Sequence, residues 1–185
     1  DLTFESLRLY NEIIGSDGID FGLEQRGSLF LCNTMKAMDD LVVKMAQLQS
    51  VGIEAELLDQ VQTQEKVGEL KVNAVGSVFY PQDAHLQPAR FVRELAQKLI
   101  ESGVKIQSKT EVLGFEKTGN RLTKVRTTRG DIDAKEVVIA SGAWSPAIAR
   151  ELGLRLKIQP GKGYSITLER PKVSADLPLM LVEMK

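Results

Sequence analysis

The chain has 185 residues, which is enough for one domain of ordinary size or for parts of two. Apolar residues make up 43% of it and charged residues 26%, so we expect a packed core. The net charge of −1 excludes the basic excess of nucleic-acid-binding proteins. No run approaches the roughly 18 apolar residues that a membrane-spanning helix requires. Cys32 and His85 are each alone of their kind, which excludes an internal disulfide and argues against a zinc site, so we expect no metal.

Helices and short strands alternate through the first half of the chain. Apolar side chains recur at helical spacing in two stretches, and Gly52 follows the second of these as a typical residue after a helix C-terminus. Asp59 is suited to cap the N-terminus of another helix, and Pro88 is suited to the first turn of a fourth. The predicted helices cover residues 2–14, 38–48 and 88–102 as well as the one after Asp59, and the predicted strands cover 26–32, 53–58 and 75–80.

The pattern changes after Gly103, where a strand is predicted over residues 104–106. Period-two alternation with two glycine turns then predicts a three-stranded antiparallel flap over residues 110–134. Residues 137–140 are fully apolar, as expected of a parallel strand that is buried on both faces. A helix through Leu152 follows, and residues 156–168 are predicted to form one or two more strands. The whole pattern favours an α/β fold, α+β overall.

Both ends of the sequence look like cuts through a longer protein. A helical pattern is already under way at Leu2, and the run from Leu177 onward is apolar and strand-like with no following partner. We therefore expect the chain to be an interior fragment of a larger protein. A small complete domain with irregular ends is the alternative.

The segment from Val137 to Pro146 (VVIASGAWSP) is the most informative about chemistry. A buried strand that ends in small residues and then begins a helix brings backbone N–H groups to the carboxyl edge of a parallel sheet, where open α/β sheets bind ligands. Helix N-termini also favour anions such as phosphate. Ser141 and Gly142 leave room for a ligand to approach the main chain. An ordinary strand–turn–helix with small residues for packing is the alternative.

Four segments in register resemble the D-amino acid oxidase superfamily, and most closely its D-amino acid dehydrogenase branch. They are Arg26–Leu29 (RGSL), Tyr80–Pro88 (YPQDAHLQP), Val137–Pro146 (VVIASGAWSP) and Pro160–Thr167 (PGKGYSIT). Each motif is modest alone, but together they cover most of the chain, from about Leu7 to Thr167.

The resemblance implies a two-domain flavoenzyme, in which a parallel sheet binds FAD and an antiparallel-rich domain covers the flavin and holds the substrate. Residues 1–78 would form the first part of the substrate domain and residues 158–185 its second part. Residues 79–157 would form the returning part of the FAD-binding domain. The expected fold is thus a partial FAD-binding parallel sheet with an antiparallel flap, plus part of an antiparallel-sheet substrate domain.

The resemblance also implies which residues contact FAD. Val112 would offer its backbone to the adenosine end, and Ser141, Gly142 and Ala143 would lie near the pyrophosphate or the ribityl chain. Trp144 would close the site beside the flavin. The alternatives are an ordinary sheet valine, a turn of small residues packed for structure, and a tryptophan that is simply part of the core.

Three further residues are candidates for the substrate side of the site. His85 lies in a proline-flanked loop, and Lys162 and Tyr164 follow a Pro-Gly break that could direct them toward the flavin. A surface or capping role for His85, a solvated Lys162 and a packed Tyr164 are the alternatives. The sequence identifies no catalytic residue.

Two departures from the family pattern bear on the cofactor and the substrate. No G-x-G-x-x-G motif occurs, although the family binds the FAD diphosphate with one. The arginine that pairs with the substrate carboxylate in these enzymes comes from a segment beyond the present C-terminus. We therefore expect FAD in the parent protein and not in this chain alone, and we expect this chain alone to be inactive.

The implied reaction is oxidation of the C–N bond of a (D-)amino acid to a 2-oxo acid and ammonia, with hydride transfer to FAD. A glycine or sarcosine oxidase, or a hydroxy-acid or glycerophosphate oxidoreductase of the same superfamily, is the first alternative. A non-catalytic binding domain is an alternative of another class. The branch implies a quinone or a carrier as electron acceptor. The lone cysteine fits a reducing compartment, so we expect a cytoplasmic protein, with peripheral association at the inner face of the cell membrane left open.

Overall fold

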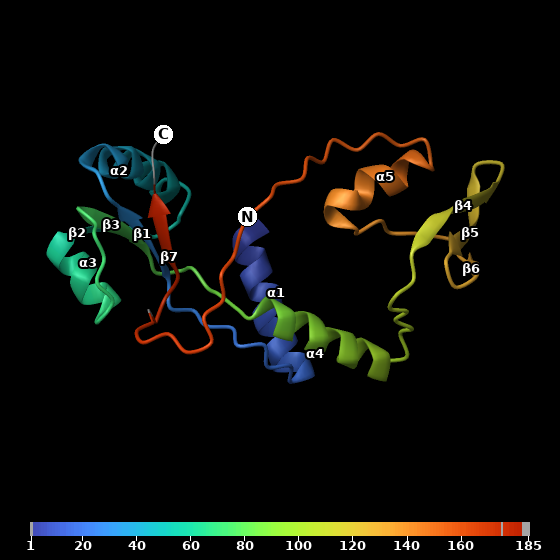
Figure 1. Cartoon of the computed structure of the whole chain (residues 1–185), viewed down its shortest axis with the longest axis horizontal. Helices are drawn as coiled ribbons and strands as arrows, with labels where there is room; N and C mark the ends of the chain where they lie inside the picture. The colour runs from blue at the N-terminus through green and yellow to red at the C-terminus, as the bar shows by residue number, and fades with distance from the viewer. Residues whose placement is uncertain (1, 175, 183–185) are drawn as a thin grey trace. The chain divides into compact units, whose positions relative to one another are not determined.

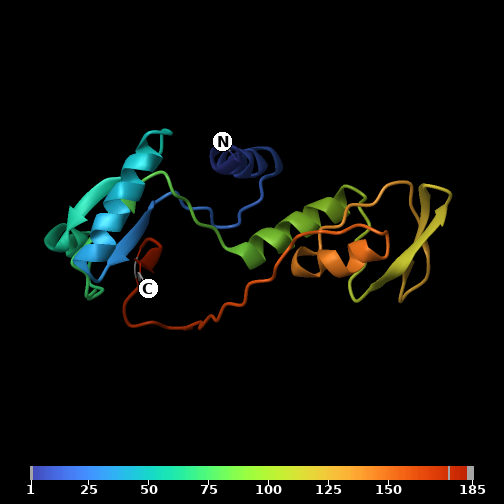
Figure 2. The same ribbon diagram turned by 90° about the horizontal axis from the view of Figure 1, so that it is seen from above.

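The structure is a computed structural model that describes residues 2–174 and 176–182. It divides into two compact units (Figure 1, Figure 2). The first consists of Asp1–Val104 and Leu168–Lys185, and the second of Lys105–Thr167. Each unit has its own sheet, so each is described separately.

The first unit contains a four-stranded mixed sheet with the order β2-β3-β1-β7. Strand β1 pairs antiparallel with β3 and parallel with β7, and β2 pairs antiparallel with β3. Its elements are α1 (Leu2–Asp17), β1 (Ser28–Cys32), α2 (Met35–Gln49), β2 (Glu56–Asp59), α3 (Gln60–Val67), β3 (Gly76–Tyr80), α4 (Pro88–Glu101) and β7 (Leu179–Val182). The predicted helices and strands up to Gly103 are therefore confirmed. The strand-like run from Leu177 contains β7, and its partner, β1, lies earlier in the sequence.

Helices α2 and α3 cover opposite faces of this sheet, because side chains along a strand alternate between its faces (Figure 1). Cys32, Val78 and Tyr80 pack with α2 in one cluster. Leu29 and Phe79 pack in the other cluster, which includes α3. All five residues of β3 are buried. The sheet is therefore the centre of a three-layer arrangement, and its apolar area is removed from water on both sides.

Side-chain caps fix where the two covering helices begin. The Thr34 hydroxyl accepts a hydrogen bond from the N–H of Ala37 at the start of α2. Asp59 caps α3, as the sequence predicts. Its carboxylate accepts from the N–H of Gln62, while the Gln62 side chain accepts from the N–H of Asp59. This reciprocal capping box satisfies two N–H groups that have no acceptor within the helix.

Three aromatic rings hold α1 and α4 together beside the sheet. The rings of Tyr10, Phe21 and Phe91 meet edge to face, with centroids 4.9 to 5.8 Å apart. An ion pair of 2.7 Å between Arg90 and Asp20 lies on the exposed side of the same junction. The rings contribute most of the stability of this junction, since an exposed ion pair contributes little.

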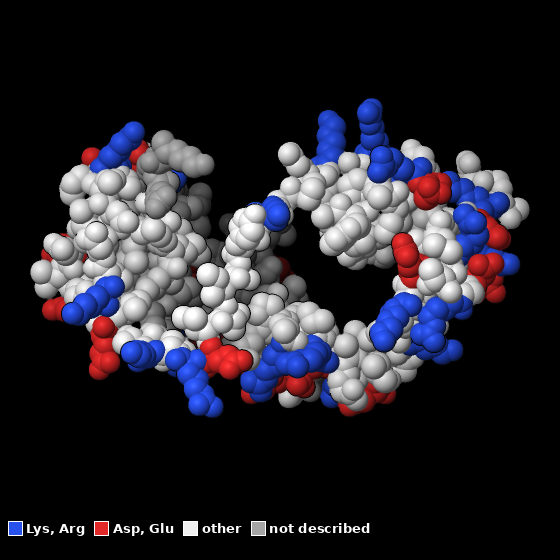
Figure 3. Space-filling view, viewed as in Figure 1, with Lys and Arg blue, Asp and Glu red and all other residues white. Residues whose placement is uncertain are grey.

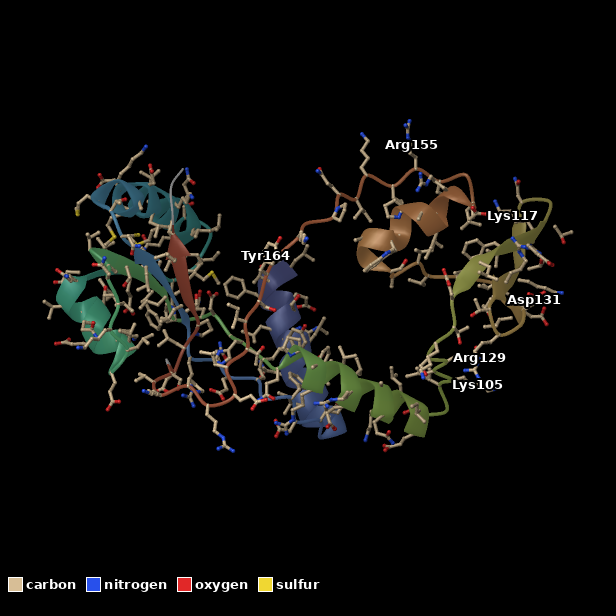
Figure 4. The ribbon with its side chains drawn as sticks, viewed as in Figure 1. Lys105, Lys117, Arg129, Asp131, Arg155 and Tyr164 are labelled. Atoms are coloured by element: carbon tan, nitrogen blue, oxygen red, sulfur yellow. The ribbon has the colours of Figure 1, made fainter. Side chains whose placement is uncertain are left out.

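The second unit contains the antiparallel flap that the sequence predicts. Strands β4 (Val112–Thr118), β5 (Arg121–Thr127) and β6 (Ile132–Asp133) form it in that order. A 3-10 turn, η1 (Gly142–Trp144), leads into the short helix α5 (Ser145–Arg150). The ammonium group of Lys117 on β4 donates to the carbonyl of Leu152, just after α5, at 3.2 Å (Figure 4). This contact ties the flap to the helix.

Three predicted strands are absent from the described residues. Residues 104–106, 137–140 and 156–168 have no regular structure, and Val138 is 89% exposed instead of buried. A strand of a parallel sheet persists only if neighbouring strands satisfy its N–H and C=O groups. No strand of the described part pairs with these segments. The mixed α/β fold class is confirmed, but the expected parallel sheet around residues 137–140 is not formed here.

The two units do not coincide with the predicted substrate and FAD-binding segments. They meet at residues 104 and 105 and at 167 and 168, whereas the predicted boundaries follow residues 78 and 157. A division by compactness does not test which segment binds which ligand. The assignment of segments to the two domains therefore stays a prediction.

Gly27 tests the packing of the sheet. Its φ is +81°, and an added Cβ would lie 2.5 Å from the Phe79 ring and 2.8 Å from the Tyr80 carbonyl oxygen. We expect Gly27→Ala to lower the free energy of unfolding by about 2 kcal/mol or more, since strain and overlap add. Urea denaturation measures this value. In the control Gly52→Ala, φ is +87° with no atom near the added carbon, so only strain of about 1 kcal/mol is expected. Equal losses in both variants would contradict the packing argument.

Candidate functional site

A cleft of about 550 Å³ lies within the second unit, between the start of β4 and the η1–α5 turn. The surface around α5 is mainly uncharged in the space-filling view (Figure 3). The residues that line the cleft are Thr110, Glu111, Val112, Leu113, Gly114 and Phe115 on one side, and Ser141, Trp144, Ala147, Ile148 and Glu151 on the other. Three of the five residues predicted to contact the cofactor, Val112, Ser141 and Trp144, are thus brought to one cleft from positions about thirty residues apart in the sequence.

An irregularity in the β4–β5 ladder shapes the first wall of the cleft. Val112 pairs with Thr127 and Gly114 with Arg126, so Leu113 is left as an extra residue in β4. Such a bulge bends a strand and changes the direction of its side chains, and bulges are common beside binding sites. Val112 and Leu113 are both exposed at the cleft. The wall is therefore an apolar surface that is open to a ligand.

A turn with bare main chain borders the second wall of the cleft. Gly142 has a φ of +54°, and no heavy atom lies within 4 Å of the place where a Cβ would stand. The N–H of Trp144 donates to the Ser141 carbonyl at 3.1 Å. No acceptor among the described residues receives the N–H of Gly142 or of Ala143, as expected of the first N–H groups of a helix. The turn is open, and a ligand can approach its backbone.

Gly142 and Ala143 themselves do not line the cleft, although they are part of the turn that borders it. Trp144 lines the cleft and is 74% exposed, so it is not a core residue. The hydroxyl groups of Ser141 and Ser145 lie 3.3 Å apart, which links the loop to the first turn of α5. Ser145 is buried and anchors this turn.

The charges of the cleft limit what it can bind. Glu111 and Glu151 are its only charged lining residues, and neither a lysine nor an arginine lines it. A phosphate or diphosphate is normally bound by cations or by several N–H groups. The apolar walls and carboxylates instead suit an uncharged ring with hydroxyl groups, and a nucleoside has both.

The three candidates for the substrate side lie outside this cleft. His85 belongs to the first unit, where its main chain exchanges hydrogen bonds of 2.8 and 2.9 Å with Glu24. Its Nε2 lies 3.9 Å from a Glu24 carboxylate oxygen. Lys162 and Tyr164 lie on an irregular segment of the second unit, with the ammonium group 5.3 Å from the ring centroid and Tyr164 89% exposed (Figure 4). Their role toward a substrate stays a prediction.

Sequence reasoning identified Trp144 but missed Ala147, Ile148 and Glu151 on α5, although a signal was present. These three residues lie three, four and seven positions after Trp144, which places all four on one face of a helix. The bulge at Leu113 had no comparable signal. No cluster of three or more His, Cys, Asp or Glu side chains within residues 2–174 and 176–182 is arranged to hold a metal ion. Within the same residues, no helix has the length and apolarity that crossing a bilayer would need.

The fold resembles the solved structures of a glycine oxidase and an L-proline dehydrogenase. Glycine oxidase from Geobacillus kaustophilus superposes with a TM-score of 0.73 at 27% identity, over 82% of this chain and 40% of that one. L-Proline dehydrogenase from P. horikoshii superposes with a TM-score of 0.72 at 26% identity, over 84% of this chain and 41% of that one.

Sequence comparison makes the assignment specific. The family model described as FAD dependent oxidoreductase matches residues 1–183, and the chain belongs to this family. A D-amino acid dehydrogenase from Granulibacter bethesdensis is 34% identical over 154 residues, which are 82% of this chain and 37% of the relative. One from Cereibacter sphaeroides is 33% identical over 168 residues, which are 89% of this chain and 38% of the relative. The chain thus spans less than two fifths of the length of these relatives.

Trp144 is the only tryptophan, so its fluorescence reports on the cleft. We expect adenosine to quench the emission and shift it to shorter wavelength, because a ring stacked in the cleft would displace water from an exposed indole. Inorganic phosphate should leave the emission unchanged, since no cation lines the cleft. A fluorescence titration measures both effects. Quenching by phosphate with no response to adenosine would contradict the electrostatic argument.

Proposed function

We propose that the protein containing this chain is an FAD-dependent dehydrogenase that oxidises the C–N bond of a D-amino acid to a 2-oxo acid and ammonia. The observation that carries the proposal is the meeting of Val112, Ser141 and Trp144 at one open cleft. The names of the curated relatives support the substrate class, since they are D-amino acid dehydrogenases. The names of the solved structures, a glycine oxidase and an L-proline dehydrogenase, support amines more broadly as the substrate class.

The cleft is suited to the adenosine end of FAD. Val112 would offer main-chain groups to the adenine ring, and Glu111 would accept hydrogen bonds from the ribose hydroxyls. Acidic side chains have this role in many dinucleotide sites. The free N–H groups of Gly142 and Ala143 would reach the start of the pyrophosphate. The rest of the diphosphate needs partners that this cleft does not have.

The irregular segments around the cleft support the same proposal. Residues 137–140 are all apolar and lie just before the turn. Residues 104–106 carry two apolar side chains around Lys105 and lie before the flap. We propose that they join the FAD-binding sheet of the whole protein, whose relatives are more than twice as long as this chain. A neighbouring strand would then satisfy the backbone groups and bury Val138.

When bound, FAD supplies the redox chemistry by accepting a hydride from the substrate carbon. The residues of this chain would position the cofactor and exclude water, and they would transfer no proton. Such positioning lowers a barrier because the reacting atoms meet in one orientation.

A glycine or sarcosine oxidase is the second candidate, because two of the solved structures with this fold are glycine oxidases. The name dehydrogenase in the sequence relatives favours an acceptor other than oxygen. We therefore propose a quinone as the electron acceptor, with the protein cytoplasmic or peripheral at the inner face of the membrane. A hydroxy-acid or glycerophosphate oxidoreductase and a non-catalytic binding domain are further outcomes of the experiments below.

Gly142 tests the cofactor site. We expect Gly142→Val in the whole protein to reduce the flavin that co-purifies by about tenfold or more, because the branched side chain would block approach to the backbone and strain its positive φ. The visible flavin absorbance relative to protein absorbance measures this occupancy. Gly153→Val is the matched control. Gly153 also has a positive φ, +76°, with no atom near the added carbon, but it lies outside the cleft. Equal flavin loss in both variants would indicate strain alone.

The substrate class is tested by turnover. We expect D-amino acids to reduce the flavin of the whole protein at least about tenfold faster than glycine, sarcosine, glycerol 3-phosphate or L-amino acids, because small losses of positioning cost large factors in rate. Stopped-flow measurement of flavin bleaching gives these rates without any electron acceptor. Fastest reduction by glycine or sarcosine would select the second candidate. A protein that purifies without flavin and reduces no acceptor would indicate a binding domain.

A further inference from the structure

A second concave site lies entirely within the first unit, between the N-terminal half of α1 and the segment that joins β3 to α4. The pocket has a volume of about 230 Å³. Its walls are mainly apolar and include Phe4, Leu7, Leu23, Ile53 and Leu86. A cavity of about 150 Å³ with apolar walls is enough to bind benzene. The pocket therefore accommodates a benzene-sized group with a short side chain.

One charge faces this apolar space. Asp83 is the only charged residue among those that line the pocket. One of its carboxylate oxygens accepts a hydrogen bond from the Ser28 hydroxyl. Asp83 forms no ion pair with a lysine, arginine or histidine of the described residues. A half-buried carboxylate without a cation is costly, and a ligand that brings one would lower this cost.

The charge of Asp83 also affects the pKa of the neighbouring residue Tyr80. Burial, and then the negative charge of Asp83, raise the pKa of the Tyr80 phenol above its usual value. Tyr80 also lines the pocket, so the negative field of the carboxylate reaches the pocket wall. The lining of the pocket then includes a neutral phenol and an anion. Both favour a hydrogen-bond donor that carries positive charge.

We propose that this pocket binds a small apolar amine, whose ammonium group pairs with Asp83 while its hydrocarbon part lies against Leu7 and Leu23. A free amino acid fits the pocket less well, because its carboxylate would meet Asp83 and no lysine or arginine lines the pocket. The site therefore differs from the amino acid site of the proposed reaction. It also shares no residue with the flavin cleft.

Isothermal titration of the purified protein with 2-phenylethylamine tests this site. We expect the amine to bind, and we expect Asp83→Asn to weaken this binding by about tenfold or more. The amide can still accept a hydrogen bond from the Ser28 hydroxyl, but it offers no charge to the ammonium group. 2-Phenylethanol and phenylalanine should bind the unchanged protein at least about tenfold more weakly. Leu7→Trp should weaken binding, because the larger side chain occupies part of the pocket.

Asp39→Asn is the matched control, since Asp39 is an exposed carboxylate on α2 outside the pocket. The affinity of this variant for the amine should equal that of the unchanged protein. Circular dichroism and flavin content are recorded for every variant. Equal affinity for 2-phenylethanol, an unchanged affinity in Asp83→Asn or Leu7→Trp, or no binding of the amine would each overturn the proposal. Amine binding by an unchanged protein that purifies without flavin would count against the proposed function alone.

Discussion

Main-chain hydrogen bonding along β1 is the interaction on which the first unit depends. β1 has a partner on each side, β3 and β7, so both of its backbone edges are satisfied. Only a strand paired in this way can bury both faces, because unpaired N–H and C=O groups would otherwise be removed from water without compensation. The two core clusters and the helices α2 and α3 follow from that burial. The close approach of Gly27 to Phe79 belongs to the same packing.

The same requirement separates the elements that the sequence predicts well from those it does not. Local signals were sufficient where the partner is near in the chain, as in the flap of β4 and β5, or where a cap such as Asp59 acts on its own helix. The apolar run 137–140 has an equally clear pattern but no strand beside it in the described residues. Periodicity reports which face of a segment is apolar, and it does not report whether a neighbour is present. β7 shows the converse, since its partner is about 150 residues earlier in the sequence.

The candidate site was predictable in part for a related reason. Val112, Ser141 and Trp144 could be identified through the resemblance to a family, and the α5 face could have been found from helical spacing. The orientation of the β4 wall depends on the extra residue Leu113, and a bulge has no dependable sequence pattern. His85, Lys162 and Tyr164 illustrate the opposite limit. Residue type and loop position suggested a role for them, but neither property places a side chain in space.

The distribution of charge explains how one unit can contribute to a dinucleotide site without forming it. The cleft presents apolar walls and two carboxylates, and no cation lines it. The two free N–H groups of Gly142 and Ala143 lie in the turn that borders the cleft. Such a surface can recognise a base and a sugar, but two phosphate charges would stay uncompensated there. The missing positive field must come from another part of a complete site, and a glycine-rich turn at the start of a helix is the usual source in this class of fold. On the proposed function, this chain would contribute recognition of the nucleoside, and the tight binding of the cofactor would depend on groups outside the cleft.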